Sequence, residues 1–320
     1  MPITNFEICS LPERGTIGLG LCCINNLLRN QKLPIYCNRT CVRRTFTVEK
    51  AKALALLNVK DIIPLIEWNE KNNIHHLRLS SDMFPHFTDA ETEPYTMDFA
   101  KEELRKAGEV AALHNHRITM HPGQYNQVGA IRPHVFDHTV DDLSMHADIL
   151  DHMNVNDNGI LCVHGGGLYG LGKEAAVRRW TEQFDDLPRK VKNRLAIENC
   201  EKCYSVRDCL EIAQACKIPM IYDNHHYDCY SILHPEETQE PITEMLGEVV
   251  ETWGSKTPLM HLSSQAPTKK IGSHSDYVNA IPQHMLDVPD FYGCKLDIEL
   301  EAKAKEDAIL HLHKEYPGLF

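Results

Sequence analysis

Short β-rich runs recur along the chain, and each ends in a polar residue before a helix-like stretch begins. Runs of this length, bounded in this way, are typical of buried strands. We predict eight strands, at Ile17–Leu21, His75–Leu79, Arg117–Met120, Ile160–Val163, Arg194–Ile197, Met220–Tyr222, Leu259–Leu262 and Lys295–Leu300.

Amphipathic segments separate the runs, and Val48–Trp68 and Thr96–His114 are two of them. In the first, Ala51, Ala55 and Val59 lie on one apolar stripe at helical spacing. Strands that alternate with helices predict a parallel α/β fold, and the count of eight favours a closed (β/α)8 TIM barrel.

A doubly wound sheet is the structural alternative. It would normally carry a glycine-rich phosphate turn between an early strand and the next helix. The glycine-rich segment GTIGLGLCC instead falls within the first predicted strand. Because no linker, low-complexity segment or short repeat divides the chain, we predict a single TIM-barrel domain over residues 1–320.

Polar side chains gather at the carboxyl ends of the predicted strands, where such a barrel keeps its active site. A histidine or a carboxylate follows or ends each strand from the third to the eighth. These residues are His121, His164, Glu198, Asp223, His225, His226, His261, His274, Asp297, Glu299 and Glu301. A single histidine here would more often be structural, but unrelated core histidines have no reason to cluster at strand ends.

This donor set indicates a site for divalent metal ions. Mixed nitrogen and oxygen ligands suit manganese, zinc, cobalt or iron, and thiolates are not needed. Two or three neighbouring ions would fit hydrolysis of a phosphodiester, because they activate a water and stabilise the attacking and leaving oxygens.

Composition and charge limit the ways in which the protein could bind nucleic acid. Among 320 residues, 42% are hydrophobic and 24% are charged, which is ordinary for a globular protein, whereas 19 histidines are unusual. The formal net charge of −12 excludes binding of nucleic acid by a basic surface. Three divalent ions would add +6 and move the formal net charge from −12 to −6. The added positive charge would lie where a phosphate must bind.

The chain shows no membrane or secretion signal. No stretch approaches the roughly 18 continuous apolar residues that cross a bilayer. The N-terminus, MPITNFEICSLPERGT, lacks a basic start and an apolar block. We therefore expect a soluble intracellular protein, in the cytoplasm or nucleoid, or in the nucleus of a eukaryote.

The 12 cysteines are irregularly spread, and several, such as Cys162, lie inside apolar runs. The pairs Cys37/Cys41 and Cys200/Cys203 could together form a four-thiolate zinc or iron–sulfur site. Their dissimilar spacing favours reduced thiols instead.

Ten short blocks carry a specific resemblance through their order and spacing. They are GLCCIN (20–25), RTCVR (39–43), LRLSSDMFPH (77–86), HPGQY (121–125), HGGG (164–167), IEN (197–199), DNHH (223–226), HLSS (261–264), HSDY (274–277) and LEAK (300–303). From Gly18 to about Lys305, the chain resembles the UV damage endonuclease family, DNA repair enzymes whose barrel is related to the apurinic endonucleases.

The resemblance implies nicking of double-stranded DNA on the 5′ side of UV photoproducts and some other distorting lesions. The products would be a 3′-hydroxyl and a 5′-phosphate, made by a metal-activated water. It implies two or three divalent ions, most of all manganese, with zinc, cobalt or magnesium as alternatives. We expect a monomer without a nucleotide cofactor or a membrane partner.

Motif matching also implies which residues form the site. The metal ligands would be His121, His164, Glu198, Asp223, His226, His261, His274 and Glu301. The catalytic set would be Glu198, Glu301, His261 and Asp223. Glu299 lies on the same strand face as Glu301, and Glu301 is preferred because it occupies the glutamate position of LEAK.

Other blocks imply contacts with the damaged DNA. Gln124 and Tyr125 match the family's probing pair, which enters the duplex where damaged nucleotides flip out. Asn25 matches a residue of the lesion pocket, and His86 is a weaker candidate near the metals. The candidate phosphate contacts are Arg39, Arg43, Arg44, Lys269 and Lys270, although basic residues on loops are usually just solvated.

Two departures from the family pattern concern the site. Leu259 stands where many members carry a lysine that becomes a carboxylated metal ligand, so one anionic bridge is missing. Leu21 stands where an aromatic residue often lines the lesion pocket. We expect the first to affect metal number and preference and the second to affect the accepted lesions.

Two other functions compete with a repair nuclease. A barrel sugar isomerase or epimerase also uses histidine and carboxylate ligands, with a lysine or glutamate that moves protons. The HPGQY loop and the arginines of the first βα loop count against it. The second competitor is a damage-binding protein whose catalysis was lost with the lysine at position 259.

Overall fold

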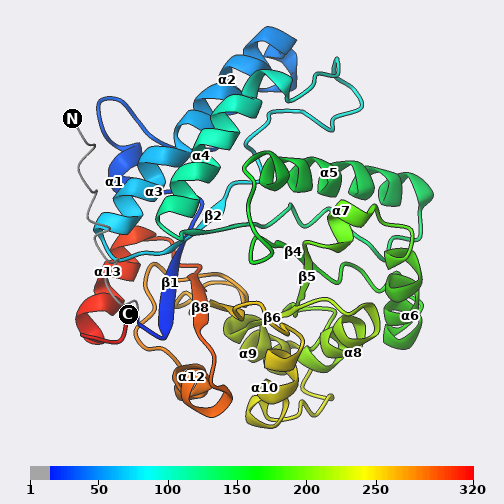
Figure 1. Ribbon diagram of the computed structural model, residues 1–320. Helices are drawn as coiled ribbons and strands as arrows, with labels where there is room; N and C mark the ends of the chain where they lie inside the picture. The colour runs from blue at the N-terminus through cyan, green and yellow to red at the C-terminus, as the bar shows by residue number, and fades with distance from the viewer. Residues whose placement is uncertain (1–14) are drawn as a thin grey trace, which may run out of the picture.

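Eight parallel strands close into a barrel in the computed structural model, which describes residues 15–320 (Figure 1). The strands pair in sequence order, and β8 pairs with β1 to close the sheet. They are β1 (Ile17–Cys22), β2 (His76–Leu79), β3 (Arg117–Met120), β4 (Leu161–His164), β5 (Leu195–Glu198), β6 (Met220–Asp223), β7 (Leu259–Leu262) and β8 (Leu296–Leu300). The predicted (β/α)8 barrel is confirmed.

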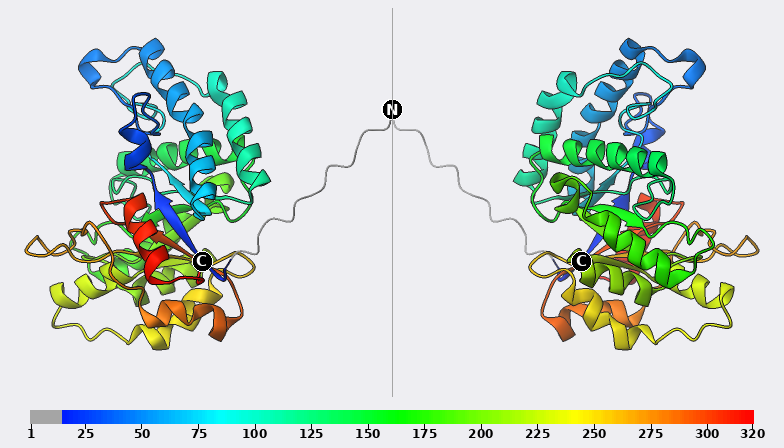
Figure 2. Two further views of the ribbon diagram at one scale, coloured as in Figure 1. Left: turned by 90° about the vertical axis from the view of Figure 1, so that its left-hand side faces the viewer. Right: turned by 90° about the vertical axis from the view of Figure 1, so that its right-hand side faces the viewer.

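Helices connect the strands and surround the barrel (Figure 1). They are α1 (Asn26–Arg29), η1 (Arg43–Thr45), α2 (Val48–Lys60), α3 (Ile62–Lys71), η2 (Asp98–Ala100), α4 (Lys101–Leu113), α5 (Pro133–His152), α6 (Lys173–Phe184), α7 (Arg189–Lys192), α8 (Val206–Cys216), α9 (Asn224–Leu233), α10 (Ile242–Glu251), α11 (Gln283–Leu286), α12 (Val288–Tyr292) and α13 (Glu306–Glu315). The early helices α2 and α4 lie on the opposite side of the barrel from α9 and α10 (Figures 1 and 2).

The start of β1 lies next to the C-terminus, since Gly15 packs against the backbone of Leu319 and Phe320 (Figure 2). None of the described helices combines the length and apolarity needed to cross a membrane. The expectation that the N-terminal segment MPITNFEICSLPERGT is not a secretion signal concerns mostly the first fourteen residues, which lie outside the described residues.

Four strands extend one residue further at the carboxyl end than the sequence predicts: β1, which ends at Cys22, and three strands whose added residue is a predicted site residue. These site residues are His164 on β4, Glu198 on β5 and Asp223 on β6. Parallel pairing continues through them, because His164 is in register with Glu198 and Asp223 with His261. Neighbouring strands therefore present these side chains at one level of the barrel.

The predicted helix Val48–Trp68 is two helices, which meet at Asp61. Pro64 lies in the first turn of α3, where it cannot donate the backbone hydrogen bond that a continuous helix would require. The Asp61 carboxylate accepts a hydrogen bond from the backbone N–H of Tyr36 at 2.8 Å and pairs with Arg39. The second predicted helix begins as the 3-10 turn η2 before α4.

Apolar side chains form a large core around the barrel and a smaller cluster inside it. The smaller cluster contains Ile160, Cys162, Ala196, Ile221, Trp253 and Leu259. Ala196, Ile221 and Leu259 each precede a site residue by two positions on their strands, so they share its face. This cluster is the apolar floor of the polar site above it.

On the β1 side, the barrel interior is polar. Glycines at positions 18 and 20 make this possible, because a Cβ at Gly18 would lie 2.8 Å from Asp297 Oδ1 and one at Gly20 would lie 2.8 Å from His76 Nδ1. Asp297 is paired with Arg117 at 2.7 Å. Small residues on β1 thus admit charged groups into the barrel.

Candidate metal centre

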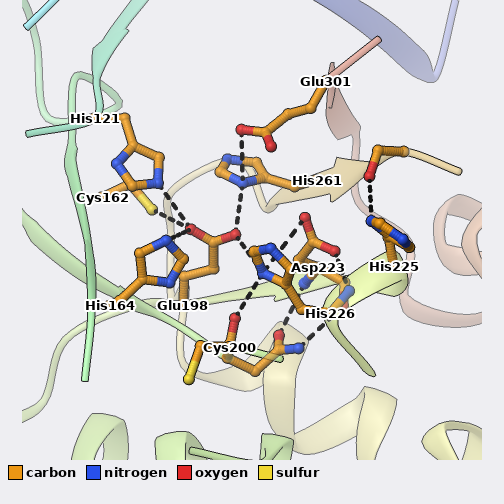
Figure 3. A network of polar contacts seen from close by, with 12 residues as sticks. His121, Cys162, His164, Glu198, Cys200, Asp223, His225, His226, His261 and Glu301 are labelled. Carbon is orange, nitrogen blue, oxygen red and sulfur yellow. Dashed lines mark hydrogen bonds and ion pairs between the residues drawn. The ribbon is translucent and has the colours of Figure 1, made fainter. Parts of the chain in front are cut away.

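Glu198 lies at the centre of a group of imidazoles at the carboxyl end of the barrel (Figure 3). Its Oε2 atom is 3.0 Å from His121 Nε2 and 3.6 Å from His164 Nε2. Its Oε1 atom is 3.0 Å from His261 Nδ1 and 3.3 Å from His226 Nδ1. One buried carboxylate therefore connects histidines from the ends of β3 and β4, from β7 and from α9.

Two members of this group are held in the protonation states that bind metals. Burial opposes ionisation of Glu198, but the neighbouring His261 and His164 hold the pKa of its carboxyl well below the usual range. Burial lowers the pKa of His164 to about 4. An ionised carboxylate and a neutral imidazole are the protonation states in which both groups ligate metals.

Backbone carbonyls orient three of the predicted ligands. The Nδ1–H of His121 donates to the carbonyl of the next residue at 3.1 Å. The Nδ1–H of His226 donates to the Asn199 carbonyl at 3.0 Å, and that of His274 to the Glu301 carbonyl at 2.8 Å. In each ring Nε2 is then the nitrogen left to ligate an ion when one binds, the usual arrangement around a protein-bound metal.

His261 is oriented by a carboxylate instead. Its Nε2 lies 3.1 Å from Glu299 Oε2, which leaves Nδ1 toward Glu198. Glu299 is held by Thr119, whose hydroxyl donates to Oε1 at 2.5 Å, and by Arg78 at 3.1 Å. Glu299 thus supports a predicted ligand from beneath, as carboxylates behind metal-binding histidines do.

Asp223 and Glu301 lie on the other side of His261, and the three offer ligand atoms within 4.8 Å of one another. Asp223 Oδ1 accepts the backbone N–H of His226 at 2.7 Å, and so caps α9. Burial raises the pKa of Asp223. Burial also opposes ionisation of Glu301, yet the paired Arg78 holds the pKa of that carboxyl far below its usual range.

The donor set fits divalent metal ions. Asp223 Oδ2 is buried and makes no hydrogen bond within residues 15–320; His226 Nδ1 is 3.8 Å away. A buried carboxylate oxygen without a hydrogen bond is costly unless a cation satisfies it. His274 joins this side through Glu301 Oε2, 3.6 Å from its Nδ1, although it stands outside the compact groups of donor atoms in the described chain.

Sequence reasoning missed Cys162 as a site residue and treated it as a core thiol. Its Sγ atom donates to Glu198 Oε2 at 3.0 Å and belongs to a compact group with His121, Glu198 and His261. Burial and the adjacent Glu198 raise the pKa of the Cys162 thiol. The signal was available, because Cys162 precedes His164 by two residues on β4 and so shares its face. Arg78, within the LRLSS block, was also missed.

The two departures from the family pattern lie in apolar surroundings. Leu259 is fully buried in the cluster that contains Cys162, and it offers no donor atom to the site. Leu21 is fully buried in the main core and does not line the groove beside Tyr125.

Gln124 and Tyr125 form an exposed tip just after β3. Tyr125 is 52% exposed, and its ring meets His138 edge-on with the centroids 5.8 Å apart. A Cβ at position 123 would lie 2.4 Å from the Tyr125 ring, so glycine there permits this ring position. The tip borders a groove of about 580 Å³.

The predicted DNA contacts near this groove already have partners. Arg43 lines it, and its guanidinium pairs with Asp89 at 2.9 Å and with Glu91. His86 also lines it, with Nε2 2.7 Å from the Cys41 carbonyl and Nδ1 3.1 Å from Asp89. The compact groups of donor atoms among residues 15–320 do not include His86, so the structure does not bring it to the metal centre.

The remaining predicted contacts differ in exposure. Arg39 is committed to its own loop, where it pairs with Asp61 at 2.6 Å and donates to the Pro34 carbonyl at 2.7 Å. Asn25 is fully buried and caps α1 by accepting the Leu28 N–H at 2.9 Å. Exposed basic side chains occur at Arg44, Lys269 and Lys270. Contact of any of these with DNA stays a prediction.

The alternative four-thiolate site gains no support. Cys37, Cys41, Cys200 and Cys203 are all free thiols, and the compact donor groups of the described chain include none of them. Among residues 15–320, no cysteine forms a disulfide.

Comparison with known proteins agrees with the site. Residues 17–319 match the family model described as "UV-endonuclease UvdE". The chain belongs to this family. The resemblance inferred from the ten blocks is therefore confirmed, and the match favours a nuclease over a sugar isomerase.

Two UvdE relatives and one solved structure illustrate the similarity. The UV-damage endonuclease of Schizosaccharomyces pombe is 36% identical over 322 residues, which cover 96% of this chain but only 51% of that protein. The putative UV-damage endonuclease of Acanthamoeba polyphaga mimivirus is 31% identical over 95% of this chain and 92% of that protein. The crystal structure of SacUVDE has a TM-score of 0.80 and 29% identity, over 93% of this chain and 98% of that one.

Proposed function

We propose that this UvdE-family chain is a metal-dependent DNA repair endonuclease that nicks the phosphodiester 5′ to UV photoproducts, leaving a 3′-hydroxyl and a 5′-phosphate. The observation that carries the proposal is the buried Glu198 carboxylate, which lies within 3.6 Å of four imidazoles at the carboxyl end of the barrel. Such a substrate would place the protein with cellular DNA, in the cytoplasm, the nucleoid or the nucleus, where it would act as a monomer.

Two or three divalent ions, most of all manganese, would be held by eight side chains: His121, His164, Glu198, Asp223, His226, His261, His274 and Glu301. When bound, such ions supply an activated water and stabilise charge on the leaving 3′-oxygen. Zinc, cobalt or magnesium are the alternatives.

The chain's own residues would set the geometry for that chemistry. Glu198 would hold negative charge between the histidines, and Asp223 is fixed by its cap on α9. Glu299 would fix the ring of His261, and Arg78 would keep Glu301 ionised. The apolar floor beneath them, which includes Leu259, would exclude bulk water from the base of the site.

The HPGQY loop would supply selection for damage. Gln124 and Tyr125 are exposed and would fill the stack that flipped nucleotides vacate, and a damaged step costs less free energy to open than an intact one. Arg43 would have to exchange Asp89 and Glu91 for a phosphate, so we expect it to contribute little affinity.

The test is nicking of supercoiled plasmid by the purified protein. UV-irradiated and undamaged plasmid are each incubated with manganese, with magnesium and with a chelator. We expect nicking of the irradiated plasmid with manganese, little nicking of undamaged plasmid, and none with chelator. Equal nicking of both plasmids, or nicking that persists with chelator, would contradict the proposal.

A further inference from the structure

Cys162 brings a sulfur atom to the metal centre from inside the barrel (Figure 3). It is 2% exposed and lies on the strand that ends in His164. Its Sγ atom is 3.0 Å from Glu198 Oε2, the same oxygen that lies 3.0 Å from His121 Nε2. The ligand atoms of Cys162, His121, Glu198 and His261 all lie within 4.8 Å of one another.

The neighbours of this thiol distinguish it from an ordinary core cysteine. Most of its cluster is aliphatic, and Ile160, Ala196, Ile221 and Leu259 offer no donor atom. The Cys162 sulfur, by contrast, contacts the charged oxygen on which two imidazoles also converge. A thiol that served packing alone would need no such contact.

We propose that Cys162 is a metal ligand, which completes one ion site of the centre with His121, Glu198 and His261 and makes that one site favour zinc or cobalt, while the sites without a sulfur donor keep manganese. The inference rests on the metal centre of the proposed function and refines it. One thiolate, two imidazoles and one carboxylate are four donors that zinc accepts, whereas manganese prefers oxygen donors.

When Cys162 binds a metal ion, its sulfur exchanges a proton for that ion. In the protein without metal, the S–H of Cys162 donates to Glu198. On binding, the sulfur forms a bond to the ion, the S–H bond breaks, and its proton passes to solvent. No oxidant or reductant takes part. The resulting thiolate adds a negative charge beside Leu259, a residue that can supply none.

Cobalt is the probe that tests the sulfur directly, because a thiolate bound to Co²⁺ gives an intense near-ultraviolet charge-transfer absorption that imidazoles and carboxylates do not give. The metal-free full chain is titrated with Co²⁺, as are Cys162→Ser and Cys162→Ala. Cys37→Ser is the matched control, because Cys37 is also a buried free thiol. Cys203→Ser controls for a more accessible thiol near the end of β5. Far-ultraviolet circular dichroism checks folding.

We expect the absorption in the wild type and in both control variants, and its loss in both Cys162 variants. If the wild type takes up cobalt without this absorption, or if folded Cys162→Ser keeps it at full intensity, the proposal is wrong.

Metal selectivity gives a second readout. By calorimetry, Cys162→Ala should lose zinc affinity by at least about tenfold more than manganese affinity. An equal loss for both ions would overturn the proposal, since it would indicate a role for Cys162 in packing only. Neither readout uses DNA. A chain that shows the cobalt absorption but fails to nick irradiated plasmid refutes the proposed function and leaves this inference intact. A chain that nicks irradiated plasmid but shows no cobalt absorption refutes this inference and leaves the proposed function intact.

Discussion

At the scale of single residues, Glu198 is the group on which the site depends. A buried carboxylate is tolerated only when charges or hydrogen bonds compensate it. Here His261 and His164 are the strongest of several groups that lower its pKa despite burial. The same four imidazoles are predicted metal ligands, so a change at this carboxyl affects all of them at once.

Glu198→Gln keeps the size of the side chain and removes its charge. We expect DNA nicking to fall by about 100-fold or more, because the shared ligand of the ions is lost, while binding to irradiated DNA stays largely intact. Plasmid nicking and gel-shift assays measure the two effects. The control is Glu49→Gln, an exposed glutamate on α2, which should change neither. Full nicking by Glu198→Gln would refute the metal assignment.

Glu299 tests whether support of His261 matters. Glu299→Gln should weaken manganese binding by about 10–100-fold, because the amide orients the imidazole less firmly than a carboxylate does. Calorimetry measures the affinity. Glu301→Gln, at a predicted ligand, should have the larger effect on metal affinity. If Glu299→Gln weakens manganese binding more than Glu301→Gln does, then Glu299 is the ligand and Glu301 is the residue that supports His261.

The sequence prediction used residue type to separate metal ligands from core residues. Residue type alone was not sufficient for Glu299, Glu301 and Cys162. The glutamates at 299 and 301 have the same type and the same strand face, so only their distances from His261 and Arg78 distinguish them. Cys162 was read as apolar because its neighbours in sequence are apolar. Arg78 lies 221 residues from Glu299, and no local pattern reports such a pairing.

At the scale of elements, the loop between β3 and α5 carries the proposed recognition of damage. The loop is anchored below its exposed tip, because the Asn126 amide donates to the Gly123 carbonyl at 3.1 Å and to Asp142 of α5 at 2.7 Å. Asp142 also accepts the hydroxyl hydrogen of Thr88, another residue that lines the groove, at 3.1 Å. A fixed base below an exposed aromatic ring is suited to insertion into a duplex.

Tyr125→Ala removes the ring that would fill the vacated stack. We expect the ratio of nicking on irradiated plasmid to nicking on undamaged plasmid to fall by about tenfold, consistent with the 1–3 kcal/mol that base–aromatic stacking contributes. Manganese affinity should be unchanged. The matched control, Tyr125→Phe, keeps the ring and should keep most of the ratio. An unchanged ratio in Tyr125→Ala would show that the ring of Tyr125 does not contribute to damage recognition.

Elements were predictable to the extent that their patterns are local. Each of the eight strands is a short apolar run with a polar end, and all were located to within one residue at either end. The break between α2 and α3 was missed because buried apolar residues recur at helical spacing on both sides of Asp61. The reasons for that break are Pro64 and the contacts of Asp61 with Tyr36 and Arg39, two residues far from it in sequence.

At the scale of the whole molecule, the two ends of the barrel have different tasks. The carboxyl ends of the strands carry the candidate metal centre, whereas polar contacts at the amino ends contribute to stability. Glu70, at the end of α3, is 3.0 Å from His75 Nδ1 and 2.5 Å from His116 Nδ1. Burial lowers the pKa of His116 to about 4. Burial disfavours ionisation of Glu70, but both histidines lower its pKa to about 2.

These shifts predict how stability depends on pH. His116 has a lower pKa in the folded protein than in the unfolded chain, so its protonation favours unfolding as the pH falls from about 6.5 to about 4. Glu70 also has a lower pKa when folded, so its contribution is complete above about pH 4.5 and is lost as the pH falls toward about 2. Both groups make the folded protein weaker in acid.

Glu70→Gln removes the second contribution and increases the first, because the Glu70 carboxylate opposes the lowering of the His116 pKa by burial. We expect its free energy of unfolding to be lower than that of the wild type by about 1–2 kcal/mol at pH 7, and the difference to narrow below about pH 4.5, where the wild-type carboxyl loses its own advantage. Urea unfolding at a series of pH values measures this. Nicking of irradiated plasmid at pH 7 should be unchanged, because Glu70 lies at the end of the barrel opposite Glu198. A difference that stays constant down to pH 3 would show that the loss comes from packing and not from charge.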